Sequence, residues 1–191
     1  MKRKKIIFPI ITAVVIAVAV IAAVWYGMNT VSYTKGAVID GVYVNEWANF
    51  KFDITSWQPI TDEEYASYGN ENTEYGFMSY GTGTGQQFSV CFEDLSVQSE
   101  KYDAAGYSAE LVKVLEKSFT EKNIPYSIGE FYETVVADET YCAFDTDIGN
   151  GKLFQRICVR IYKNRAITVS VSSTDNAVID ETFKSIVAVT E

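Results

Sequence analysis

The stretch LFQRICVRIYKNRAITVSVS, residues 153–172, contains two runs of alternating apolar and polar side chains, separated by Lys163-Asn164. Successive side chains of a strand point to opposite faces, so each run presents one apolar face. Asn tolerates the left-handed backbone conformation that a tight turn requires. The stretch therefore predicts a hairpin with strands at 153–162 and 166–172.

Other alternating runs extend this hairpin into a sheet. The further strands are expected at 41–45, 49–54, 77–80, 87–94, 128–135 and 141–146. Most neighbouring strands are joined by short turns instead of helices, which is typical of antiparallel pairing. We therefore expect an α+β fold, in which an antiparallel β-sheet is flanked by helices.

Two longer helices are expected beside the sheet. Residues 108–122 carry apolar side chains at helical spacing, and Asn123 with Pro125 ends that pattern. Asp175 is placed to cap a final helix near the C-terminus. The run from Thr61 to Glu64 has the form of a capping box, which indicates the start of a third, short helix.

A membrane span is predicted near the N-terminus. Residues 6–26 are uncharged and largely apolar, and the basic residues 2–5 precede them. A helix of about 20 residues crosses the hydrocarbon core of a bilayer. The positive-inside rule keeps residues 1–5 in the cytoplasm, so residues 6–26 are expected to act as a single-pass signal anchor in the cell membrane.

A cleaved signal peptide is the alternative, because Ala17-Val18-Ala19 fits the pattern of a cleavage site. The apolar run nevertheless continues beyond it to Tyr26. We expect a cytoplasmic stub at 1–5, a transmembrane helix at 6–26, a linker at 27–41 and an extracytoplasmic domain at 42–191.

The charge of the chain disfavours several classes of partner. The net charge is −9, and the part after Tyr26 has 12 basic against 25 acidic side chains, which gives −13. Nucleic-acid binders usually present a basic face, so no nucleic-acid partner is expected. The chain contains no His, which excludes Ser-His-Asp and Cys-His mechanisms.

One local pattern resembles the opening of PsbP-like domains, which also occur in bacterial envelope proteins of the DcrB type. The pattern consists of Tyr43-Val44-Asn45, then residues 49–54 with the sequence NFKFDI, then Trp57, although Thr55 and Ser56 stand where a Pro often precedes that Trp. The resemblance covers about residues 42–188. It implies an α/β/α sandwich with a binding or assembly role, no enzyme activity and no cofactor.

Two cysteines are candidates for a disulfide bond. If Gly149, Asn150 and Gly151 form a three-residue loop, symmetric counting along the two strands places Cys142 opposite Cys158. Directly opposed residues of a hairpin have Cβ atoms about 4.5–5.5 Å apart. Outside the membrane a disulfide between them is chemically allowed. Small buried thiols are the alternative interpretation.

Four residues are candidates for binding a partner. Trp47 lies in the turn expected between the first two strands, where an aromatic ring can serve as an interface anchor. Arg156, Arg160 and Tyr162 share the strand face opposite the apolar one, which suggests docking of an acidic partner. A face covered by solvent or by a helix is the alternative.

The sequence supports three hypotheses on function. The first is a non-enzymatic binding or assembly module of the cell envelope whose partner is another envelope protein. The second is a receptor for wall glycans or a small ligand that uses exposed aromatic rings. The third is a hydrolase built on a pair of carboxylates, for which no spacing signature is present.

Overall fold

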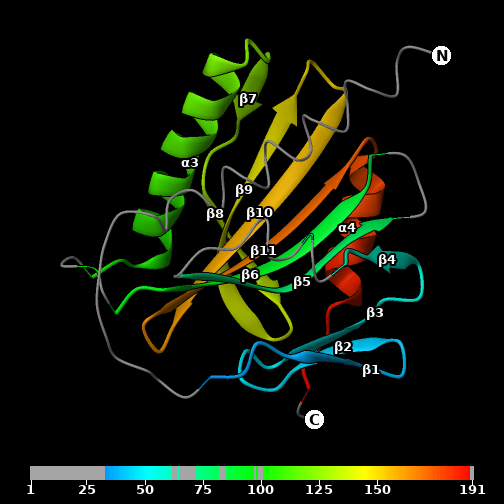
Figure 1. The fold of residues 1–191 in the computed structure, drawn as a ribbon. Coiled ribbons are helices and arrows are strands. Elements are labelled where there is room, and N and C mark those ends of the chain that lie inside the picture. The colour runs from blue at the N-terminus through cyan, green and yellow to red at the C-terminus, as the bar shows by residue number, and fades with distance from the viewer. Residues whose placement is uncertain are drawn as a thin grey trace.

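The computed structural model describes residues 33–61, Glu64, 72–81, 85–96, Gln98 and 101–189. Within these residues the larger sheet has eight antiparallel strands in the order β4-β5-β6-β11-β10-β9-β7, and β8 also pairs with β9 (Figure 1). Its strands are β4 (Trp57–Pro59), β5 (Thr73–Gly81), β6 (Gln87–Asp94), β7 (Tyr126–Ile128), β8 (Tyr132–Val136), β9 (Glu139–Ile148), β10 (Leu153–Tyr162) and β11 (Arg165–Ser173).

The predicted hairpin forms the centre of this sheet. Tyr162 pairs with Arg165, so Lys163 and Asn164 alone make the turn between β10 and β11. Both have positive φ angles, 45° and 60°, as a two-residue hairpin turn with the right twist requires. The alternating pattern therefore predicted both strands and their turn correctly.

A smaller sheet packs against one face of the larger one. It consists of β1 (Ala37–Ile39), β2 (Val42–Asn45) and β3 (Phe50–Asp53). Aromatic rings join the two sheets: the Phe52 ring centroid lies 4.3 Å from that of Phe88 and 5.1 Å from that of Phe77. Aromatic rings that lie at such distances and are inclined to each other stabilise the fold by more than the burial of their surface alone.

Helices cover both faces of the larger sheet. Helix α3 (Ala104–Glu121) buries Leu111, Leu115 and Phe119 against β9 and β10. Helix α4 (Asn176–Ser185) lies on the opposite face, over β10 and β11 (Figure 1). The two larger apolar clusters are distinct because alternate strand residues contribute to each. The predicted α+β class with an antiparallel sheet and flanking helices is confirmed.

The boundaries differ from the prediction in three places. Helix α3 begins at Ala104 instead of residue 108, because Asp103 caps it by accepting a hydrogen bond from Gly106 N at 2.7 Å. The strand expected at 128–135 is divided into β7 and β8. The capping box does form, since Thr61 N donates to Glu64 Oε2 at 2.8 Å and Glu64 N donates to Thr61 Oγ1 at 3.3 Å.

The linker predicted at 27–41 is wrong at its C-terminal end. Strand β1 lies inside it, and Tyr33 packs its ring 5.5 Å from Trp47 and 5.9 Å from Phe92. The folded part therefore begins by Tyr33. The predicted span at 6–26 lies outside the described residues, and none of the described helices is long and apolar enough to cross a membrane.

Candidate functional site

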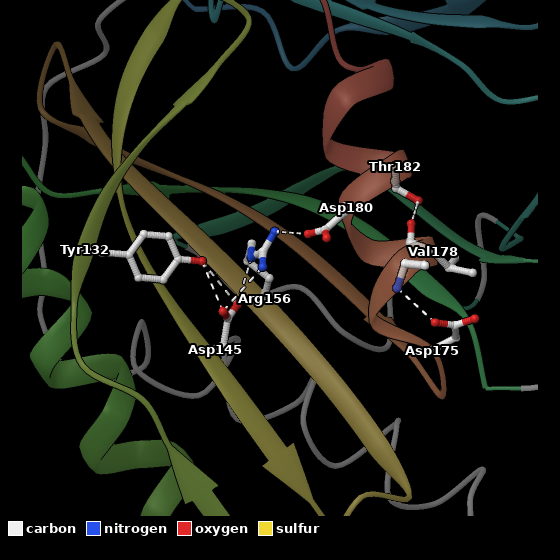
Figure 2. A network of polar contacts seen from close by, with 8 residues as sticks. Tyr132, Asp145, Arg156, Asp175, Val178, Asp180 and Thr182 are labelled. Atoms are coloured by element: carbon white, nitrogen blue, oxygen red, sulfur yellow. Dashed lines mark hydrogen bonds and ion pairs between the residues drawn. The ribbon is translucent and has the colours of Figure 1, made fainter.

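Arg156 lies at the centre of a polar network between β10 and α4 (Figure 2). Its Nε donates to Asp145 Oδ1 at 2.8 Å, its Nη2 donates to Asp145 Oδ2 at 3.3 Å, and its Nη1 donates to Asp180 Oδ1 at 2.7 Å. The Tyr132 hydroxyl lies 3.2 Å from each oxygen of Asp145. One guanidinium therefore joins β9, β10 and α4, and Tyr132 attaches β8.

The local fold explains why these groups meet. The strand register places Asp145 directly opposite Arg156. Asp175 caps α4 by accepting a hydrogen bond from Ala177 N at 2.9 Å, and this start places Asp180 above β10. The Arg156 guanidinium also lies 5.8 Å from the centre of the Phe183 ring, one turn further along α4.

The network changes the pKa of two of its members. Burial by itself would lower the pKa of Arg156, but the hydrogen bonds to Asp145 and Asp180 outweigh burial and raise it. Burial is also the largest effect on Tyr132, and together with the charge of Asp145 it raises the pKa of that hydroxyl to about 12. Arg156 is therefore charged and Tyr132 is neutral at physiological pH.

The other three predicted partner-binding residues meet at one end of β10. The Trp47 ring centroid lies 5.1 Å from that of Tyr162, and the Arg160 guanidinium lies 4.8 Å from the centre of the Tyr162 ring. Arg160 Nη2 also lies 2.9 Å from Glu139 Oε2. Arg156 shares the strand face of Arg160 and Tyr162 but lies four residues before Arg160 along β10.

Docking of an acidic partner on this face stays a prediction. Both arginines are already paired with carboxylates of the chain, so an acidic partner would have to displace Asp145, Asp180 or Glu139. The helix-covered alternative agrees with the position of α4. The pairing with Arg156 also accounts for Asp145 and Asp180 without a catalytic role.

A hollow of about 380 Å³ lies between the β8–β9 turn and the segment that follows α4. It is lined mainly by apolar side chains, with Asp138 and Lys184 as its charged members. Two valines on its rim are strongly exposed: Val135 at 68% and Val187 at 48%. Exposed apolar side chains that gather around a hollow are typical of a binding surface.

The sequence did not predict the hollow or the acidic partners of Arg156. A signal for Asp145 existed, because a register that opposes Arg156 and Asp145 pairs unlike charges across the hairpin. No comparable signal exists for the hollow, since Val135 and Val187 are 52 positions apart in the sequence and meet only through the tertiary fold.

The predicted facing of Cys142 and Cys158 is wrong by one residue. Ile148 pairs with Leu153, so the loop between β9 and β10 has four residues, and Cys142 lies opposite Val159. Because neighbouring residues point to opposite faces, Cys142 and Cys158 are on different sides of the sheet. Both are free thiols. Burial raises the pKa of the Cys158 thiol.

The aromatic rings proposed for glycan binding are used in packing. Trp47 contacts Tyr33, Phe92 and Tyr162, and the Trp57 ring lies 5.4 Å from that of Phe88. Both tryptophans are half-buried against the same apolar cluster. The described residues contain no group of three or more His, Cys, Asp or Glu placed to hold a metal ion.

Comparison with known proteins identifies a fold and no family. No family model matches the chain, and no curated protein matches it. The chain is similar to the solution structure of cyanobacterial PsbP (CyanoP) from Synechocystis sp. PCC 6803, with a TM-score of 0.55 and 10% sequence identity over 84% of this chain and 98% of that one. This likeness supports the PsbP-like fold expected from residues 43–57.

Proposed function

We propose that the protein is a non-enzymatic binding module of the cell envelope. In this proposal residues 6–26 hold it in the cell membrane, and the folded domain docks onto another envelope protein outside the membrane. The uncharged run at 6–26 and the basic residues before it support the attachment. The PsbP-like fold supports a binding role, because domains of this fold type are generally not enzymes.

The hollow beside α4 carries the proposal. A hollow of about 380 Å³ is within the range of binding pockets, and six of its eight lining residues are apolar, beside one acidic and one basic residue. The exposed side chains of Val135 and Val187 would lose contact with water when a partner covers them. Burying one such side chain stabilises a complex by about 1–2 kcal/mol.

The test is crosslinking in cells with tagged full-length protein, followed by mass spectrometry of the captured proteins. The variant Val187→Asp places a charge on the rim of the hollow. Val38→Asp is the matched control, since Val38 is an equally exposed valine at 50% and lies on β1, away from the hollow. We expect the wild type and Val38→Asp to capture the same envelope protein and Val187→Asp to lose it.

Two results contradict this proposal. One is the repeated absence of any stoichiometric companion of the wild-type protein. The other is capture that Val187→Asp leaves unchanged, because the companion would then bind elsewhere. Circular dichroism of both variants shows whether a loss of capture comes from a loss of folding.

A further inference from the structure

The first described residue of the chain is fixed to the folded domain at one end of the central sheet. The Arg165 guanidinium lies 3.6 Å from the centre of the Tyr33 ring, and Arg165 Nη2 lies 3.0 Å from Asp94 Oδ2. Tyr33 also packs on Trp47 and Phe92. We call this contact between Tyr33, Arg165 and Asp94 the Tyr33 clamp.

The clamp leaves little free chain between the domain and the predicted span. Seven residue steps separate Tyr26 from Tyr33. A fully extended chain covers at most about 3.5 Å per step, so the proposed span would hold Tyr33 within about 25 Å of the extracytoplasmic surface of the cell membrane. Strand β10 has ten residues and is itself about 33 Å long. A connection shorter than the sheet favours an orientation in which the end that carries the clamp lies nearer the bilayer.

That end of the domain contains several segments that the fold brings together. The β10–β11 turn at Lys163 and Asn164 directly precedes Arg165 of the clamp. The β8–β9 turn, with Ala137 and Asp138, belongs to the same end, because Arg160 near the end of β10 pairs its charge with Glu139. In Figure 1 both turns and the smaller sheet lie in the lower part of the view, and the β9–β10 turn lies at the top.

We propose that the Tyr33 clamp orients the domain, with the end that carries the β10–β11 and β8–β9 turns facing the phospholipid surface. This inference rests on the proposed attachment through residues 6–26. It places the hollow at the membrane-facing end, because Ala137 and Asp138 of the β8–β9 turn line it. A partner then reaches the hollow with a segment that lies close to the membrane.

The experiment uses full-length protein in vesicles of phosphatidylethanolamine and phosphatidylglycerol. A photoreactive benzoylphenylalanine replaces either Lys163 or Lys152, and the lipid adducts formed on illumination are measured by mass spectrometry. These two lysines are matched, since both are exposed, both lie in hairpin turns, and they flank β10 at its two ends. We expect several-fold more lipid adduct from position 163 than from position 152.

A second variant tests whether the short connection causes the orientation. A long Gly-Ser insertion between Thr30 and Val31 keeps residues 6–26 and the clamp but frees the domain to rotate. We expect the excess of adduct at position 163 to disappear. Equal adduct at both positions in the original chain, or an excess that survives the insertion, would overturn the inference.

The membrane attachment is tested separately in the same vesicles by extraction at alkaline pH. A chain that stays with the lipid but gives equal adducts at both positions contradicts the orientation alone. A chain that is extracted into the supernatant contradicts the attachment, and with it both the proposed function and this inference.

Discussion

Removing the charge of Arg156 should destabilise the domain by about 2 kcal/mol, which is more than the effect of removing either of its partners. The Arg156 side chain is 25% exposed, while those of Asp145 and Asp180 are 49% and 51% exposed. Ion pairs at fully exposed sites contribute about 0.2–1 kcal/mol, and a two-point contact between arginine and a carboxylate is stronger. Loss of Arg156 removes both ion pairs. It also leaves the carboxylates of Asp145 and Asp180 without the guanidinium that they share.

The variant Arg156→Met separates the charge from the packing, because its apolar side chain keeps contact with Phe183. We expect Asp145→Asn to cost about 1 kcal/mol and Asp180→Asn about 0.5 kcal/mol, since Asp145 has two contacts with Arg156 and Asp180 has one. The free energy of unfolding is measured by urea denaturation of residues 33–191, which contain all three apolar clusters. Double-mutant cycles then isolate the coupling of each pair.

The reasoning fails if Arg156→Met is as stable as the wild type, or if both double variants are additive. The first result would contradict the predicted cost of removing the charge, and additive double variants would show that the network contributes no coupling energy across the interface between β10 and α4. High salt offers an independent check, because screening weakens partly exposed pairs and should reduce the coupling of Asp180 most.

Three further predictions concern other parts of the fold. Asp103→Ala removes the cap of α3 and should lower the free energy of unfolding by about 1 kcal/mol in urea denaturation, whereas an unchanged midpoint would contradict the capping role. Burial raises the pKa of Glu93, which accepts a hydrogen bond from the Tyr107 hydroxyl. The folded state therefore holds this proton more tightly, so stability should fall as the pH rises from 4.5 through the raised pKa, and Glu93→Gln should flatten that dependence in unfolding measured across pH. Cys142 is half-buried and the other two thiols are fully buried, so maleimide labelling followed by mass spectrometry should modify Cys142 first, and equal rates at all three would refute the burial assigned to them.

The sequence predicted the fold well where the pattern is local. The alternation in residues 153–172 identified β10 and β11, and the Lys163-Asn164 turn fixed their register. Asp175 was predicted as the cap of the final helix, and it is. The division of the strand expected at 128–135 was not predictable from local pattern. It arises because β7 and β8 pair with two separate parts of β9. The start of the folded part was also missed, since the packing of Tyr33 involves residues far along the chain.

The candidate site depended on details that local patterns do not determine. A loop of four residues instead of three shifts the register of β9 against β10 by one position. Since the two faces of a strand alternate, this single step separates Cys142 from Cys158 and brings Asp145 opposite Arg156. The sequence contained the information to choose between the two registers, because one of them pairs opposite charges. The assumed turn length therefore predicted the wrong register, whereas the pairing of opposite charges would have predicted the observed one.

The walls of the hollow are held by contacts that do not depend on a partner. Tyr132 and Asp145 attach β8 to the Arg156 network, and Asp180 attaches α4 to the same network. The segment after α4 is fixed to β3, since Lys51 N donates to Val187 O at 2.8 Å and Val187 N donates to Lys51 O at 3.0 Å. A partner would therefore meet a surface that is already formed, and binding would require little ordering of the chain. If Arg156→Met loosens α4, the affinity for the partner should fall even though no residue on the rim of the hollow has changed.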